Sequence, residues 1–210
     1  MAGILMCMGK FTSFFGSLVL ALLVLGIPVR AAEQTAVFAG GCFWGVEAVF
    51  EHVKGVIDVR SGYSGGTKNT ATYEDVGTGT TKHAESVEVK FDPAKVTYEQ
   101  LLYVFFTVAH DPTEVNRQGP DTGPQYRSVI FYTDEAQRKS AKVFIDAINA
   151  SKALNEPVAT QLVPFTAFYE AEDYHQNYLK NNPKDVYIVV HDMPKLEVLK
   201  QKFPDLYRSE

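Results

Sequence analysis

A glycine pair followed by a cysteine, Gly40-Gly41-Cys42, constrains the fold of this chain more than any other stretch. The residues before it, Gln34 to Ala39, form a short apolar run typical of a strand, and Val46 to Val53 repeat apolar side chains at helical intervals. The glycines permit a tight turn and the close approach of another molecule. Cys42 is therefore predicted to lie where a strand gives way to a helix.

A thiol in the first turn of a helix lies in the positive field of the helix N-terminus, which lowers its pKa and favours the nucleophilic thiolate. The sequence therefore predicts a reactive Cys42 with a lowered pKa. The alternative is a buried structural cysteine, which is the more common fate of a free thiol. A core cysteine does not need glycines beside it, so the reactive thiol is favoured.

An uncharged apolar run from Phe11 to Val29 follows Lys10 near the N-terminus. Val29-Arg30-Ala31 then supplies small or medium-sized residues for cleavage. This pattern predicts a secretory signal peptide over residues 1–31 and export to the periplasm. The run is also nearly long enough to span a bilayer, so a membrane anchor facing the periplasm is the alternative.

Loss of this leader would leave residues 32–210, a length that suits one domain with a sizeable core. The remaining chain carries a net charge of −7, which disfavours nucleic acid and anionic membrane surfaces as partners. Cys42 is then its only cysteine, so no internal disulfide can form. A lone thiol exported to an oxidising compartment suggests a function for it.

Strands and helices alternate along residues 32–210 without strict periodicity. The patterns predict strands near residues 55–63, 83–91, 128–132 and 158–163, and helices near 97–109, 134–150 and 173–179. We expect an α/β (α+β) fold, a two-layer α/β sandwich with a mixed central sheet flanked by helices and a ferredoxin-like core. Two long polar loops, Thr67 to Lys82 and Thr113 to Gln125, are candidates for function.

One acidic residue is predicted to face the core. In the strand His83 to Phe91, Glu85 shares its face with Val87 and Val89. Burial of a carboxylate raises its pKa, because the charged form loses its hydration. The alternative is a frayed strand end that turns Glu85 toward water.

Several chemistries could use a thiolate at the start of a helix. A cysteine hydrolase or transpeptidase would place one of the five histidines beside Cys42 as a base, but no local signature marks one. A metal site would need ligand spacing that a single cysteine and scattered histidines lack, so no bound metal or cofactor is expected. A non-catalytic module that binds oxidised or Met-rich peptides is a further alternative.

Attack on the sulfur of a sulfoxide requires different partners. A neutral acid must protonate the oxygen, and an inward-facing Glu85 would supply it. Hydroxyl donors and an aromatic wall for the methyl group would help. Tyr73 and Tyr126 lie in the two polar loops, and Phe43 and Trp44 adjoin Cys42.

Six sequence blocks in a fixed order extend this interpretation over Ala36 to Asn182. They are Gly41-Cys42-Phe43-Trp44-Gly45, Gly62-Tyr63-Ser64-Gly65-Gly66, Tyr73-Glu74-Asp75-Val76, His83-Ala84-Glu85-Ser86-Val87, His110-Asp111-Pro112-Thr113 and residues 117–128. Together they resemble the A-type peptide methionine sulfoxide reductase family. The resemblance implies a two-layer α/β sandwich and reduction of methionine-S-sulfoxide, free or in proteins, in the repair of oxidative damage.

The resemblance also implies roles for single residues. Cys42 would attack the sulfoxide sulfur and become a sulfenic acid, while Glu85 protonates the oxygen. Tyr73 and Tyr126 would bind that oxygen through their hydroxyl groups. The remaining implied substrate-binding residues are Phe43 and Trp44, which form the methyl pocket, and Asp121.

The tail departs from many relatives, which carry resolving cysteines there. Asn181 to Glu210 contains no cysteine. We therefore expect an external thiol, from a thioredoxin-like protein or a small molecule, to reduce the sulfenic acid of Cys42. The expected enzyme is a monomer that acts on oxidised proteins or free methionine sulfoxide.

Overall fold

The computed structural model describes residues 32–209. The predicted signal peptide, residues 1–31, lies outside the described residues. Among those described, no helix combines the length and apolar character needed to cross a membrane.

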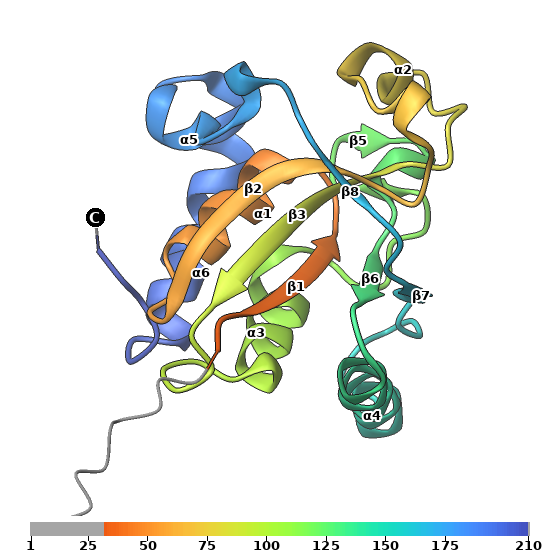
Figure 1. Ribbon diagram of the computed structural model, residues 1–210. Coiled ribbons are helices and arrows are strands. Elements are labelled where there is room, and N and C mark those ends of the chain that lie inside the picture. Colours follow the sequence, from red (N-terminus) through yellow and green to blue (C-terminus); the bar gives the residue numbers. More distant parts are fainter. Residues whose placement is uncertain (1–31, 210) are drawn as a thin grey trace, which may run out of the picture.

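A six-stranded mixed sheet forms the centre of the molecule (Figure 1). In spatial order its strands are β7 (Gln161–Pro164), β6 (Val129–Tyr132), β1 (Gln34–Ala39), β3 (Ala84–Phe91), β2 (Val56–Ser64) and β8 (Phe168–Glu170). Neighbouring strands are antiparallel except β6 and β7, which are parallel. The inner order β6-β1-β3-β2, with a helix after β1 and another after β3, is the ferredoxin-like arrangement that we predicted.

Helices surround the sheet (Figure 1); the first packs on β2 and β3, and the fourth packs on β6 and β7. They are α1 (Phe43–Glu51), α2 (Tyr73–Gly77), α3 (Tyr98–Val104), α4 (Glu135–Ser151), α5 (Tyr178–Asn181) and α6 (Met193–Lys202). Two π-helical turns extend them, η2 (Phe105–Ala109) after α3 and η5 (Ile188–Asp192) before α6. The α3 helix begins at a capping box, in which Thr97 and Gln100 satisfy each other's backbone N–H groups. The predicted fold class is confirmed.

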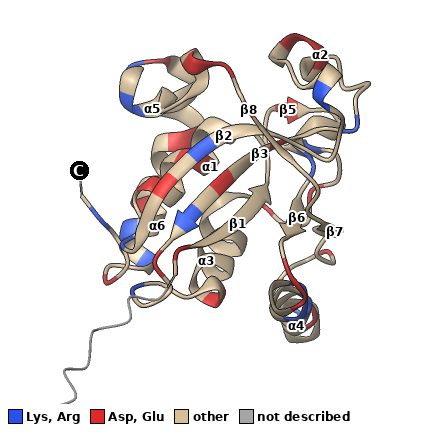
Figure 2. Cartoon of the chain, in the orientation of Figure 1, with Lys and Arg blue, Asp and Glu red and all other residues tan. Residues whose placement is uncertain are grey.

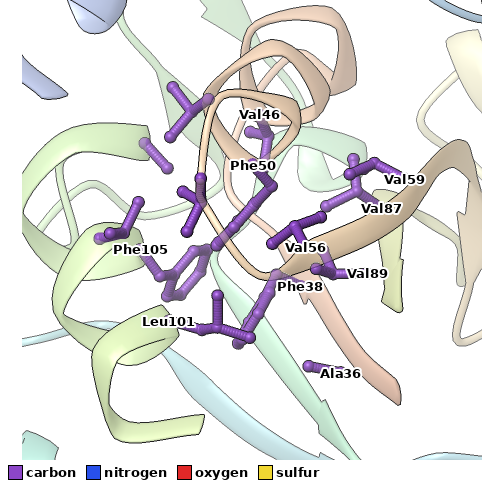
Figure 3. Packing of buried hydrophobic residues seen from close by; sticks show 14 of the residues in the cluster. Ala36, Phe38, Val46, Phe50, Val56, Val59, Val87, Val89, Leu101 and Phe105 are labelled. Carbon is purple, nitrogen blue, oxygen red and sulfur yellow. The ribbon is translucent and has the colours of Figure 1, made fainter. Parts of the chain in front are cut away.

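Aromatic packing fixes α1 against the sheet (Figure 3). Phe38 of β1 stacks on Phe50 of α1 with ring centroids 5.1 Å apart, and on Phe105 at 4.9 Å. All three side chains are buried, and burial of each contributes about 1.5–3 kcal/mol. The start of α1, and with it Cys42, is therefore held at a defined place beside the end of β1.

Short elements were missed by the sequence patterns. The loop from Thr67 to Lys82 contains α2, which begins where the Thr72 hydroxyl accepts a hydrogen bond from the backbone N–H of Asp75 at 3.2 Å. The strand β8 has three residues and pairs only with the end of β2. Elements this short carry too few residues for a periodic pattern to emerge.

Candidate active site

Cys42 occupies the N-cap position of α1, as the glycine pair predicted. Gly41 has φ of +93°, and a Cβ atom there would lie 2.5 Å from the side chain of Gln118. A Cβ atom on Gly40 would lie 2.8 Å from the ring of His110. The two glycines therefore allow the turn and make room for side chains of the second polar loop and of His110.

The predicted low pKa of Cys42 is wrong for the resting site. Burial raises the pKa of the thiol well above its ordinary value, and the charges of Glu85 and Asp192 raise it further. The backbone N–H of Trp44 and the ammonium of Lys195 lower it, but their effect is smaller. Because desolvation outweighs the helix N-terminus, the free site holds a neutral thiol.

Glu85 faces inward, so the frayed strand end is wrong. Its side chain is almost fully buried, and Oε2 accepts a hydrogen bond from the backbone N–H of Phe43 at 3.1 Å. Burial raises the pKa of Glu85 to about 8, against the opposing effect of the Phe43 N–H, and the charge of Asp121 raises it as well. The carboxyl group is therefore mostly protonated at neutral pH, and it is hydrogen-bonded to the backbone of Phe43, the residue that follows Cys42.

An aromatic cluster surrounds Trp44, the residue two positions after the cysteine. The indole ring stacks on Tyr178 at 3.7 Å with an interplanar angle of 7°, and Tyr187 packs edge-on at 6.0 Å. The indole N–H donates to Nδ1 of His175 at 3.0 Å, so Nδ1 is the unprotonated nitrogen of that ring. Phe43 packs beside the same histidine at 5.0 Å and is fully buried.

The two tyrosines predicted from the polar loops lie in the same electrostatic environment. Burial raises the pKa of Tyr73 to about 12, and the charges of Glu85 and Cys42 contribute. The pKa of Tyr126 is raised by burial and then by Glu85, Asp121, Tyr73 and Cys42. Both hydroxyl groups therefore remain protonated donors near Cys42 and Glu85.

Asp121, in the short strand β5 (Asp121–Thr122), accepts a hydrogen bond from the Tyr187 hydroxyl at 2.5 Å. This contact joins the second polar loop to the C-terminal tail. The structure thus brings the other six predicted residues together near Cys42 and adds residues of later segments that the sequence patterns did not indicate.

The site residues from Glu172 onward had little sequence signal. Tyr187 lies in a partly apolar stretch, and His175 stands in no long periodic element. Glu172 was missed as well; it accepts hydrogen bonds from the Tyr63 hydroxyl and from the backbone N–H of Tyr73, both at 2.9 Å. Only the Tyr-His-Gln run at residues 174–176 could have marked this segment.

Two buried histidines make their hydrogen bonds away from Cys42, whereas His175 lies beside Phe43 and Trp44. His110 contacts the Phe105 carbonyl at 3.0 Å and the Ser128 hydroxyl at 2.7 Å, and His83 contacts the Thr67 carbonyl. His175 uses Nδ1 to accept the indole N–H of Trp44, and in the part of the chain that the structure describes no histidine is hydrogen-bonded to the Cys42 thiol as the base of a cysteine hydrolase would be. Within residues 32–209, no cluster of three or more acidic, histidine or cysteine side chains could hold a metal ion.

Comparisons with known proteins agree with this geometry. Residues 34–207 match the family described as peptide methionine sulfoxide reductase. The chain is 52% identical over 181 residues to the reductase MsrA 2 of Synechocystis sp., covering 86% of this chain and 84% of that protein. It is 55% identical over 178 residues to MsrA 2 of Mesorhizobium japonicum, covering 85% and 91% of the two chains.

Solved structures show the same fold. Reduced Mxr1 of Saccharomyces cerevisiae aligns with a TM-score of 0.68 at 34% identity, over 73% of this chain and 88% of that one. Methionine sulfoxide reductase A of Corynebacterium diphtheriae aligns with a TM-score of 0.63 at 35% identity, over 77% and 81%. The chain therefore belongs to the peptide methionine sulfoxide reductase A family.

Proposed function

We propose that this protein reduces methionine-S-sulfoxide, free or in oxidised proteins, to methionine and so repairs oxidative damage. One observation carries the mechanism: a buried carboxyl group, Glu85, is protonated at neutral pH and hydrogen-bonded to the residue beside a buried thiol, Cys42. An acid and a nucleophile so placed can act together on a sulfoxide.

In the proposed first step, the Cys42 sulfur attacks the sulfoxide sulfur while Glu85 gives its proton to the oxygen. The thiol proton of Cys42 then returns Glu85 to its neutral form. The oxygen passes to the cysteine, so methionine leaves and Cys42 becomes a sulfenic acid. The substrate sulfur gains two electrons and the Cys42 sulfur loses two, with no other reactant consumed.

The surrounding side chains suit a methyl sulfoxide. The hydroxyl groups of Tyr73 and Tyr126 stay protonated, which supports a role as donors to the oxygen. Phe43 and Trp44 supply apolar surface for the methyl group. Asp121, held by Tyr187, is proposed to contact the polar part of the substrate.

We propose that an external thiol regenerates the enzyme, because Asn181 to Glu210 contains no cysteine. A first thiol would form a mixed disulfide with Cys42 and release water, and a second would release Cys42 as the thiol. Mxr1 of yeast has been solved in complex with Trx2, and that structure aligns with a TM-score of 0.50 at 26% identity. This supports a thioredoxin-family reductant; a small thiol is the other candidate.

The proposed enzyme is an exported monomer, with residues 32–210 as a single reductase domain. The apolar run before Ala31 supports export to the periplasm, with retention as an anchor as the alternative. The intact mass of the secreted protein distinguishes the two.

Separate incubation with the two sulfoxide epimers and dithiothreitol tests the function. We expect methionine to form from the S epimer alone. With substrate but no reductant, mass spectrometry under non-reducing conditions should show a monomer with one added oxygen on Cys42. An internal disulfide would refute the external route, and no turnover of either epimer would restore the hydrolase and the peptide-binding module as candidates.

A further inference from the structure

Two charged side chains of the tail pack against the first turn of α1. Asp192 ends the π-helical turn η5, Lys195 lies at the start of α6, and their Oδ1 and Nζ atoms are 3.0 Å apart. A Cβ atom on Gly45 would overlap the Asp192 carboxylate and would lie 2.7 Å from the Lys195 nitrogen. The pair therefore rests directly on the backbone three residues after Cys42.

This ion pair is asymmetric in its burial. The Asp192 side chain is 0% exposed, and its Oδ2 atom has no hydrogen-bond partner within the described chain. The Lys195 side chain keeps 21% of its surface in water. A buried carboxylate oxygen without a partner costs free energy, so packing alone gives no reason for this arrangement.

The pair also carries two of the three side-chain charges that act on Cys42, although burial raises the pKa of Asp192 above its ordinary value. The three charged groups come from different elements: Glu85 on β3, Asp192 on η5 and Lys195 on α6. The charge of Cys42 in turn raises the pKa of four neighbouring hydroxyl groups, those of Tyr73, Tyr126, Tyr178 and Tyr187. The hydroxyl groups are neutral, and Glu85 is mostly neutral at neutral pH. Asp192 raises the pKa of Cys42 and Lys195 lowers it.

We propose that Asp192 and Lys195 are positioning residues that govern the ionisation of Cys42 from the tail. Asp192 adds to the effect of burial in keeping the resting thiol neutral, and Lys195 stabilises the anion that forms when the sulfur attacks. The consequence for turnover rests on the proposed function, whereas the control of ionisation does not. The tail would then act on the cysteine through charge, although it offers no second thiol.

The test is the pH dependence of Cys42 alkylation by iodoacetamide in the full-length protein, followed by mass spectrometry of the peptide that contains Cys42. Asp192→Asn should lower the pH midpoint and speed alkylation at neutral pH by about threefold or more, since one pKa unit changes the thiolate fraction about tenfold. Lys195→Met should raise the midpoint, because it removes the positive charge that lowers the pKa of Cys42.

A matched control is available on α4, which carries both acidic and basic residues (Figure 2). Asp146 forms an exposed ion pair with Lys142 at 2.8 Å, so Asp146→Asn makes the same change in net charge and should leave the midpoint unchanged. Because burial is the main cause of the raised pKa of Cys42, a merely loosened site would lower the midpoint in both variants, whereas the proposal requires Lys195→Met to raise it. The side chain of Lys195 is partly exposed, so this variant tests the proposal even if Asp192→Asn does not fold.

A midpoint of Asp192→Asn at or above that of the wild type would overturn the proposal, and so would a midpoint of Lys195→Met at or below it. Alkylation requires no sulfoxide turnover, so this outcome is independent of whether the proposed function holds.

Discussion

Replacement of Glu85 separates the chemical role of its proton from its structural role. In Glu85→Gln, the amide oxygen can still accept the hydrogen bond from the Phe43 N–H, which Glu85 accepts at 3.1 Å, and the amide nitrogen can donate to the sulfoxide oxygen. Glu85→Ala removes both contacts. Because a general acid contributes about 10²–10⁴ in rate, we expect Glu85→Ala to lose that factor and Glu85→Gln to retain activity within about tenfold of wild type.

The pH dependence gives the sharper distinction. The pKa of Glu85 is raised to about 8, so about 90% of the groups carry the proton at pH 7 and about 10% at pH 9. Wild-type kcat/KM should therefore fall as pH rises through about 8. In Glu85→Gln the thiol proton must leave to solvent, so activity should rise with pH as the thiolate fraction of Cys42 grows.

The assay is kcat/KM for free methionine-S-sulfoxide across neutral and alkaline pH, with dithiothreitol in excess so that the reductant does not limit the rate. Circular dichroism confirms that each variant is folded. If the alanine and glutamine variants both retained wild-type rates, or if the wild-type profile rose through pH 8, Glu85 would not be the acid.

Three further substitutions, one with a matched control, test substrate binding at the site and the stability of the fold around it. Tyr187→Phe removes the hydroxyl that donates to Asp121 at 2.5 Å, and KM for the sulfoxide should rise about fivefold. An unchanged KM would show that this hydrogen bond does not position Asp121 for substrate binding. Gly41→Ala should lower the free energy of unfolding by about 1–3 kcal/mol in a denaturant titration, because φ is +93°, whereas Gly77→Ala, with open space around it, should cost less. Glu47 of α1 is buried, which raises its pKa to about 8. Glu47→Gln should therefore be more stable than wild type by about 1–4 kcal/mol at pH 8, and the difference should nearly vanish at pH 4, where the carboxyl group is mostly neutral in both the folded and the unfolded state. Equal stability at pH 8 would contradict this.

Local patterns predicted the parts of the site that local rules govern. The alternation along β3 places every second side chain on one face, and Glu85 is buried among Val87 and Val89 as that period requires. The glycine pair before Cys42 needed a turn, and Gly41 adopts the positive φ that such a turn uses. These features depend on neighbours a few residues away, which a sequence displays directly.

The ionisation of Cys42 could not be predicted in this way. The helix N-terminus is a local feature and indicates a lowered pKa, whereas the burial that reverses the direction comes from packing with distant segments. Asp192 and Lys195 lie more than a hundred residues after Cys42. Their contact depends on how the tail folds over α1, and a short tail helix gives no indication of its docking face.

The raised pKa of the thiol and the raised pKa of Glu85 fit together in the proposed mechanism. A free thiolate would be open to irreversible oxidation, because the thiolate is the form that reacts with oxidants. A buried neutral thiol beside a buried neutral acid is inert until a sulfoxide supplies an oxygen that can take the proton of Glu85. Protonation of that oxygen leaves Glu85 as the base for the thiol. In the proposed mechanism the substrate therefore activates its own nucleophile, and desolvation, which opposes the helix field, protects the cysteine between turnovers.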